Sequence, residues 1–78
     1  MPFSDEHLAE LNLLTRFPTS STQRGIKVHS QSAAPEVVKA AESLYARGLT
    51  SQKDGGYLTS LGAEAAELAQ KLQSILSH

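Results

Sequence analysis

The sequence lacks cysteine and long apolar runs, and each absence excludes a class of protein. With no cysteine among 78 residues, neither a disulfide framework nor a thiolate metal site can form. No apolar run approaches the roughly 20 residues that a helix needs to cross a bilayer. The first residues also lack the positively charged and apolar regions of a signal peptide, so we expect a cytoplasmic protein with no membrane contact.

Sequence motifs for catalysis are lacking too. The histidines His7, His29 and His78 are far apart along the chain, and no H-E-x-x-H spacing occurs. No serine lies in a G-x-S-x-G motif, and no phosphate-binding G-x-x-x-x-G-K-[ST] loop is present. We therefore predict that the protein is not an enzyme and has no catalytic, metal-binding or cofactor-binding residues. No small-molecule effector can be inferred from the sequence.

The net charge of −1 does not by itself indicate a nucleic-acid-binding protein, but the charges are unevenly distributed. Residues 1–15 carry a net charge of −3, residues 16–53 carry +4, and residues 54–78 carry −2. A basic centre between acidic ends is typical of a small regulator whose DNA-contacting region is central. The alternative is that these charges are simply distributed over a solvated surface.

The length predicts a single domain over residues 1–78. A core of this size is marginal, because a domain of about 60 residues buries only about 60% of its unfolded surface. We therefore expect efficient packing or a partner subunit to supply further stability.

Residues 44–62 contain the strongest local signals in the chain. Gly48 can adopt the left-handed conformation that ends a helix. Asp54-Gly55 is expected to supply the positive φ values of a tight hairpin turn between two short strands. Thr59 is placed to cap the next helix with its hydroxyl. The segment predicts a helix end, a hairpin and a second helix.

The same segment resembles a known family of proteins. It has the form L-x-x-x-G-L, a short polar hairpin, then Y-x-L-T-x-x-G, with these positions filled by Leu44, Gly48, Leu49, Tyr57, Leu58, Thr59 and Gly62. This pattern resembles the winged helix-turn-helix of MarR-like and PadR-like bacterial regulators. The whole chain is also similar to short uncharacterised bacterial proteins that are described only as DNA-binding.

The resemblance implies a fold and a function. The fold would be mainly α with a small antiparallel sheet, a winged helix-turn-helix of three to four helices plus a β-hairpin wing. The function would be binding of double-stranded DNA by a transcriptional regulator, with a recognition helix at about 35–47 and a wing at 49–59. The alternative is a winged-helix module for protein–protein interaction without nucleic-acid binding.

The N-terminal part predicts a helix that begins at Ser4 and ends before Pro18. Phe3 and Leu8 have the spacing of a hydrophobic staple. The apolar face of this helix predicts a set of core residues, namely Leu8, Leu11, Leu13, Leu14 and Phe17.

Residues 19–34 have a less regular pattern. The alternation at 26–29 predicts a short strand, which in winged helices often pairs with the wing. Either a stub of helix at about 20–24 serves as the first helix of the helix-turn-helix, or that motif is degenerate. Pro35 then suits the first position of the next helix.

The candidate DNA contacts are polar and basic side chains near the wing and on the preceding helix. They are Arg24, Lys27, Lys39, Ser43, Arg47, Gln52 and Lys53. Lys53 and Arg47 could instead be a solvated turn lysine and an arginine that complements a helix dipole. Glu36 and Glu42 on the same helix would repel phosphate, which favours the protein-contact alternative.

A long helix is predicted from about residue 60 to residue 76. Apolar residues recur along it at steps of four and three, namely Leu61, Ala65, Leu68, Leu72 and Ile75. This is the spacing of a helix that pairs with another helix. We expect a homodimer through this helix, although part of the same face must cover the core of the monomer.

Overall fold

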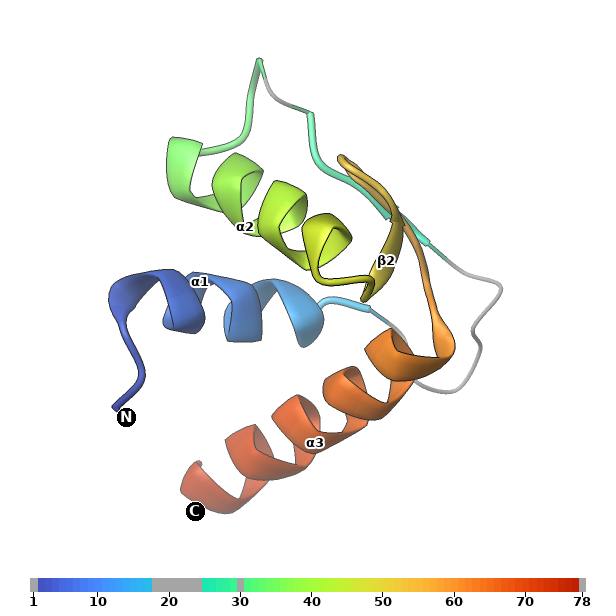
Figure 1. Cartoon of the computed structure of the whole chain (residues 1–78). Helices are drawn as coiled ribbons and strands as arrows, with labels where there is room; N and C mark the ends of the chain where they lie inside the picture. The colour runs from blue at the N-terminus through green and yellow to red at the C-terminus, as the bar shows by residue number, and fades with distance from the viewer. Residues whose placement is uncertain (1, 18–24, 30, 78) are drawn as a thin grey trace.

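The computed structural model describes residues 2–17, 25–29 and 31–77, and Figure 1 shows how their elements are arranged. These residues form three helices and a three-stranded antiparallel sheet of order β1-β3-β2, which confirms the predicted fold class. The elements in chain order are α1 (Asp5–Leu14), β1 (Ile26–Lys27), α2 (Pro35–Ala46), β2 (Thr50–Gln52), β3 (Gly55–Leu58) and α3 (Ser60–Leu76). The order from α2 through the hairpin to α3 is compatible with a winged helix.

Between α1 and α2, the described residues contain a strand and a turn but no helix. The strand β1 covers two residues and is shorter than the predicted strand at 26–29. Val28 follows it and still donates its N–H to the carbonyl oxygen of Asp54 at 2.7 Å. The predicted helical stub at 20–24 lies outside the described residues. A complete helix-turn-helix is therefore not present in the part of the chain that the structure describes.

Helix α1 begins with a capping box. The Ser4 hydroxyl accepts the N–H of His7 at 3.2 Å, and the Nδ1 atom of His7 accepts the N–H of Ser4 at 3.2 Å. The ring of Phe3 lies edge-on to the imidazole, with 6.1 Å between the ring centroids. The predicted cap is confirmed, and His7 has a local structural role because its acceptor nitrogen satisfies an otherwise unpaired backbone donor.

The predicted core position of Leu8 is wrong. Leu13, Leu14 and Phe17 are buried, whereas the side chain of Leu8 is half exposed. Each helical residue turns the chain by about 100°, so Leu8 lies roughly 140° around the helix from Leu13. The apolar residues of α1 therefore extend further around the helix than the face that the fold buries.

Helix α2 ends in a Schellman motif at Gly48. This glycine has a φ of 79°, and the N–H of Leu49 donates to the carbonyl oxygen of Leu44 at 2.9 Å. The helix buries Ala40, Ala41 and Leu44. The predicted helix end is confirmed, and the chain leaves it in the direction of the hairpin.

The hairpin turn differs from its prediction in one detail. The positive φ values belong to Gly55 (117°) and Gly56 (70°), and no described non-glycine residue has one, so the prediction for Asp54 is wrong. The pairing of Thr50 with Leu58 and of Gln52 with Gly55 leaves an irregularity between them. Gly55 and Gly56 accommodate that irregularity, because glycine adopts positive φ without a Cβ clash.

Helix α3 is joined to the end of α2 by its capping residue. The hydroxyl of Thr59 accepts the N–H of Gly62 at 3.0 Å and donates to the carbonyl oxygen of Gly48 at 2.7 Å. A Cβ at Gly62 would collide with the carbonyl oxygen of Leu49, so this glycine permits a close approach. The predicted cap is confirmed, and it also connects both ends of the hairpin.

The core lies where the three helices and the sheet meet. In Figure 1, α1 lies between α2 and α3, and the sheet closes the right-hand end of the molecule. Phe17 and Leu44 are the largest side chains with less than 2% exposure. The side-chain amide of Gln70 donates to the carbonyl oxygen of Phe17 at 2.8 Å and so ties α3 to the end of α1.

Candidate nucleic-acid interface

The structure divides the predicted DNA contacts between two sides of α2. Lys27 and Lys53 lie on the side of β1 and the hairpin turn, which we call the hairpin flank. Lys39 and Ser43 line a groove between α1 and α2, which we call the α1 flank. Arg47 belongs to the α1 flank as well, because it pairs with a carboxylate of α1. The sequence predicts all of these residues as DNA contacts, near the wing and on the preceding helix.

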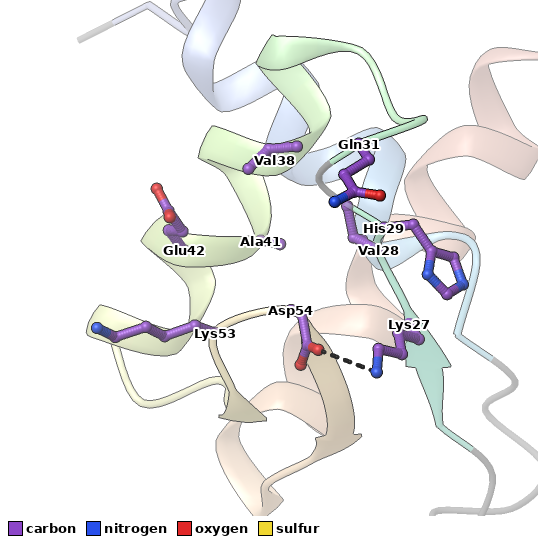
Figure 2. Close-up of a pocket in the computed structure, with 9 residues that line it drawn as sticks. All are labelled: Lys27, Val28, His29, Gln31, Val38, Ala41, Glu42, Lys53 and Asp54. Atoms are coloured by element: carbon purple, nitrogen blue, oxygen red, sulfur yellow. Dashed lines mark ion pairs between the residues drawn. The ribbon is translucent and has the colours of Figure 1, made fainter.

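The hairpin flank is a hollow of ≈ 320 Å³. Figure 2 shows that its residues come from β1, the turn after it, α2 and the hairpin. The apolar floor is made by Val28, Val38 and Ala41. The rim is polar and consists of Lys27, His29, Gln31, Glu42, Lys53 and Asp54.

The two lysines of this rim are differently placed. Nζ of Lys27 lies 3.8 Å from a carboxylate oxygen of Asp54, and both side chains are well exposed. Such a pair contributes about 0–1 kcal/mol in water, so Lys27 can exchange Asp54 for another anion at little cost. Lys53 lines the pocket on the side opposite Lys27, and its side chain points away from Lys27 (Figure 2). Both ammonium groups are accessible to a phosphate.

A neighbouring hollow of ≈ 300 Å³ adds a third cation to this side. It shares Lys27, Val28 and His29 with the first hollow and is also lined by Arg16, which follows α1. We call Arg16, Lys27, His29 and Lys53 the basic band. Arg16 is not among the contacts predicted from the sequence, because only folding brings the end of α1 beside β1.

The α1 flank is more acidic than the hairpin flank, whose rim has two lysines and two carboxylates. Its groove of ≈ 330 Å³ is lined by Lys39 together with four acidic residues, Asp5, Glu6, Glu10 and Glu36. A phosphate in this groove would meet more carboxylates than ammonium groups. The α1 flank is therefore electrostatically unfavourable for DNA, despite the presence of three predicted contacts.

Two of those predicted contacts are held by a carboxylate from α1. The Nε atom of Arg47 lies 3.1 Å from an oxygen of Glu10, and the hydroxyl of Ser43 donates to the same oxygen at 3.3 Å. The side chain of Glu10 is 10% exposed, whereas that of Arg47 is 57% exposed. This network connects α1 to the last turn of α2, because the nearly buried carboxylate needs partners of its own.

The outward surface of α2 offers little for reading bases. Its exposed residues are Pro35, Glu36, Lys39, Glu42, Tyr45 and Ala46, so it carries one lysine and two carboxylates. Gln52 is exposed on β2, next to the hairpin turn, and Arg24 lies outside the described residues. The described chain thus presents exposed cations more clearly than side chains suited to reading bases.

The predicted dimer residues lie along α3. Leu61, Leu68 and Ile75 are 54%, 63% and 62% exposed, and Leu72 is partly exposed. Ala65 is half-buried. The stripe predicted from the sequence is therefore largely uncovered in the single chain.

Metal centres and membrane spans are not found in the described part of the chain. Its residues contain no group of three or more His, Cys, Asp or Glu side chains placed to hold a metal ion. Among residues 2–17, 25–29 and 31–77, no helix is both long enough and apolar enough to cross a membrane.

Residues 1–77 match the model of a family described as a family of unknown function (DUF5669), and the chain belongs to that family. No curated protein and no solved structure matches the chain. The two flanks of α2 and the exposed stripe of α3 are therefore the features from which a function can be inferred.

Proposed function

We propose that this protein binds double-stranded DNA through the basic band, with the hairpin at 49–59 lying along the phosphate backbone. The observation that carries the proposal is the meeting of Arg16, Lys27 and Lys53 at two adjoining hollows on one side of α2. These residues are 11 and 26 positions apart in the sequence, and the fold brings them to a common surface. Exposed cations that follow one surface are the electrostatic feature that a nucleic-acid backbone recognises.

The strength of binding follows from the number of cations. Each neutralised phosphate contributes a slope of about −0.9 to the dependence of log affinity on log salt. Three lysine and arginine contacts would give a slope of roughly −3 for one protomer, which is modest. A single protomer should therefore bind weakly and should tolerate different DNA sequences.

Helix α2 has a supporting role in this proposal. The segment at 35–47, which the winged-helix resemblance assigns to recognition, has Lys39 and Glu42 on its exposed side. We propose that α2 positions the hairpin against the duplex and does not itself read bases. Regulation of transcription in the cytoplasm, without catalysis, is the role that follows from the resemblance.

The experiment is an anisotropy titration of a labelled random duplex at low and moderate salt. We expect binding that weakens steeply between about 50 and 200 mM salt. The double variant Lys27→Glu/Lys53→Glu should lose about tenfold or more in affinity, because two attractive contacts become repulsive. The matched control Lys39→Glu, which changes a lysine of the α1 flank, should stay within about twofold.

Two results would contradict the proposal. The first is the absence of binding at low salt, where non-specific electrostatic association is strongest. The second is an equal loss for the control and for the double variant, which would show that net charge matters and the basic band does not.

A second candidate function, protein–protein interaction, is favoured by the acidic α1 flank. Asp5, Glu6 and Glu36 surround a groove that has an apolar part at Ala9 and Ala40. A basic amphipathic segment of another protein would complement this surface in charge and in shape. The DNA titration discriminates between the two, since an interaction module would show no salt-dependent association with duplex.

A further inference from the structure

Helix α3 has two faces of different composition. The residues that it buries against its own subunit are small, namely Gly62, Ala66 and Ala69. The large aliphatic residues lie on the adjoining face and remain exposed, namely Leu61, Leu68, Leu72, Ile75 and Leu76. Of the stripe, Ala65 packs against the monomer's own core, but covering that core does not account for the large exposed residues of the stripe.

The exposed stripe is nearly symmetric about its midpoint. Leu61 and Ile75 each lie seven residues from Leu68, and Ala65 and Leu72 lie three and four residues from it. A sequence with this property can face a copy of itself that runs in the opposite direction, because Leu61 then meets Ile75, Leu68 meets Leu68 and Leu72 meets the small Ala65. A two-fold axis through Leu68 would place Leu61 of one copy opposite Ile75 of the other.

The charges beside the stripe specify the direction of pairing. Glu64 and Lys71 are exposed on the side of the stripe that faces away from the body. Within residues 2–17, 25–29 and 31–77, neither side chain forms an ion pair. In an antiparallel pair, Glu64 of each copy comes beside Lys71 of the other, which gives two ion pairs by symmetry.

A parallel pair would not use these charges. In that arrangement, a side chain at the position of Glu64 or Lys71 faces the position five residues later in the other helix. Those positions are Ala69 and Leu76, and Ala69 is buried against its own subunit. The antiparallel arrangement is therefore the one that satisfies both the apolar stripe and its flanking charges.

We propose that α3 pairs with α3 of a second copy of this chain in an antiparallel arrangement, with the two-fold axis at Leu68. The helix has 17 residues and is about 25 Å long, which is comparable to the principal extents of the subunit, 34 × 28 × 22 Å. This pairing does not depend on DNA binding.

The first test is the mass of the protein in solution by sedimentation equilibrium over a range of concentrations. The unmodified protein should be a dimer at micromolar concentration or above. Leu68→Glu should raise the dissociation constant by at least about a hundredfold, because two carboxylates would face each other at the axis. Ser74→Glu adds the same charge to α3 away from the stripe and should leave the dimer intact.

The folding of Leu68→Glu is checked by circular dichroism, and its exposed position gives no reason for unfolding. A monomeric unmodified protein at about 100 μM would overturn the proposal. An equal effect of both variants on the dissociation constant would also overturn it.

The second test determines the direction of pairing by disulfide cross-linking. The chain has no cysteine, so Leu61→Cys and Ile75→Cys each introduce a single thiol. In the antiparallel pair, position 61 of one copy is about 20 Å from position 61 of the other, beyond the reach of a disulfide. We therefore expect no cross-link in either variant alone and efficient cross-linking when the two are mixed, with one carrying a mass tag.

A parallel pair would give the reverse result, with cross-links in each variant alone, and would overturn the antiparallel assignment. The charges provide an independent check. Glu64→Lys and Lys71→Glu should each weaken the dimer by about 3- to 30-fold, and the double exchange should restore it. Additive losses in the double variant would also contradict the pairing. Because these tests use no DNA, their failure is distinct from failure of the proposed DNA binding.

Discussion

The two flanks of α2 contain similar numbers of cations but present them differently to solvent. On the α1 flank, Arg47 is paired with Glu10, and Lys39 lies in an acidic groove. On the hairpin flank, Lys27 has only an exposed partner at 3.8 Å, and the exposed side chain of Lys53 points outward from the rim. The difference shows that the availability of a cation to an anionic ligand depends on the carboxylates that the fold places beside it, and the position of the cation in the sequence does not reveal them.

The largest expected effect comes from reversing the whole basic band. We expect the variant Arg16→Glu/Lys27→Glu/Lys53→Glu to lose about 100-fold or more in affinity for duplex DNA at low salt. The slope of log affinity against log salt should fall in magnitude by about three, because three phosphate contacts are removed. The measurement is an anisotropy titration at several salt concentrations. An unchanged slope would show that the band does not touch phosphate.

The next effect concerns the stability of the α1 flank. Arg47→Met should lower the free energy of unfolding by about 1–3 kcal/mol, because the nearly buried Glu10 loses its charged partner. Glu10→Gln should cost less than about 1 kcal/mol, since the exposed Arg47 regains water and the amide still accepts a hydrogen bond. Urea denaturation of both variants measures the difference between their losses in unfolding free energy. The comparison of flanks would be wrong if Arg47→Met were neutral for stability but weakened DNA binding strongly.

A smaller effect should follow from removing the internal partner of Lys27. Asp54→Asn keeps the size of the side chain and removes a negative charge from the rim of the hairpin flank. Affinity for duplex DNA should rise by about two- to fivefold, because a repulsive carboxylate is lost and Lys27 is released. The matched control is Glu36→Gln, which removes a charge from the α1 flank and should change affinity by less. Equal gains from both would indicate a general effect of net charge.

The smallest expected effect concerns Ser43. Its hydroxyl donates to Glu10 and accepts from the Nε atom of Arg47 at 3.4 Å, so it joins the two sides of the ion pair. Ser43→Ala should lower the free energy of unfolding by about 0.5–1 kcal/mol and leave DNA affinity unchanged. Parallel urea and anisotropy measurements check both parts. A loss of affinity without a loss of stability would place Ser43 at the DNA after all.

The sequence predicted those features of the fold that depend on neighbouring residues. Gly48 and Thr59 were identified as the end of one helix and the cap of the next, because each acts on backbone groups within a few positions. The hairpin between them was identified for the same reason. The positive φ values were misplaced by one residue, since the local irregularity in strand pairing was not visible in the sequence.

The site was harder to predict because its geometry depends on contacts between distant residues. Glu10 holds Ser43 from 33 positions away, and no local pattern signals that pairing. Arg16 was missed because it joins the hairpin flank only after α1 and β1 have come together. Leu8 was wrongly assigned to the core, because helical spacing identifies an apolar face but does not say how wide the buried part is.

The hydroxyl of Thr59 has a consequence for the geometry of an assembled protein. It joins the carbonyl group of Gly48, before the hairpin, to the amide of Gly62, after it, so the hairpin is clamped at its base between two helices. The direction in which the hairpin projects is therefore set by the axis of α3. If two α3 helices pair, the two hairpins stand at one fixed separation, and a DNA duplex must present its backbones at that spacing in order to engage both.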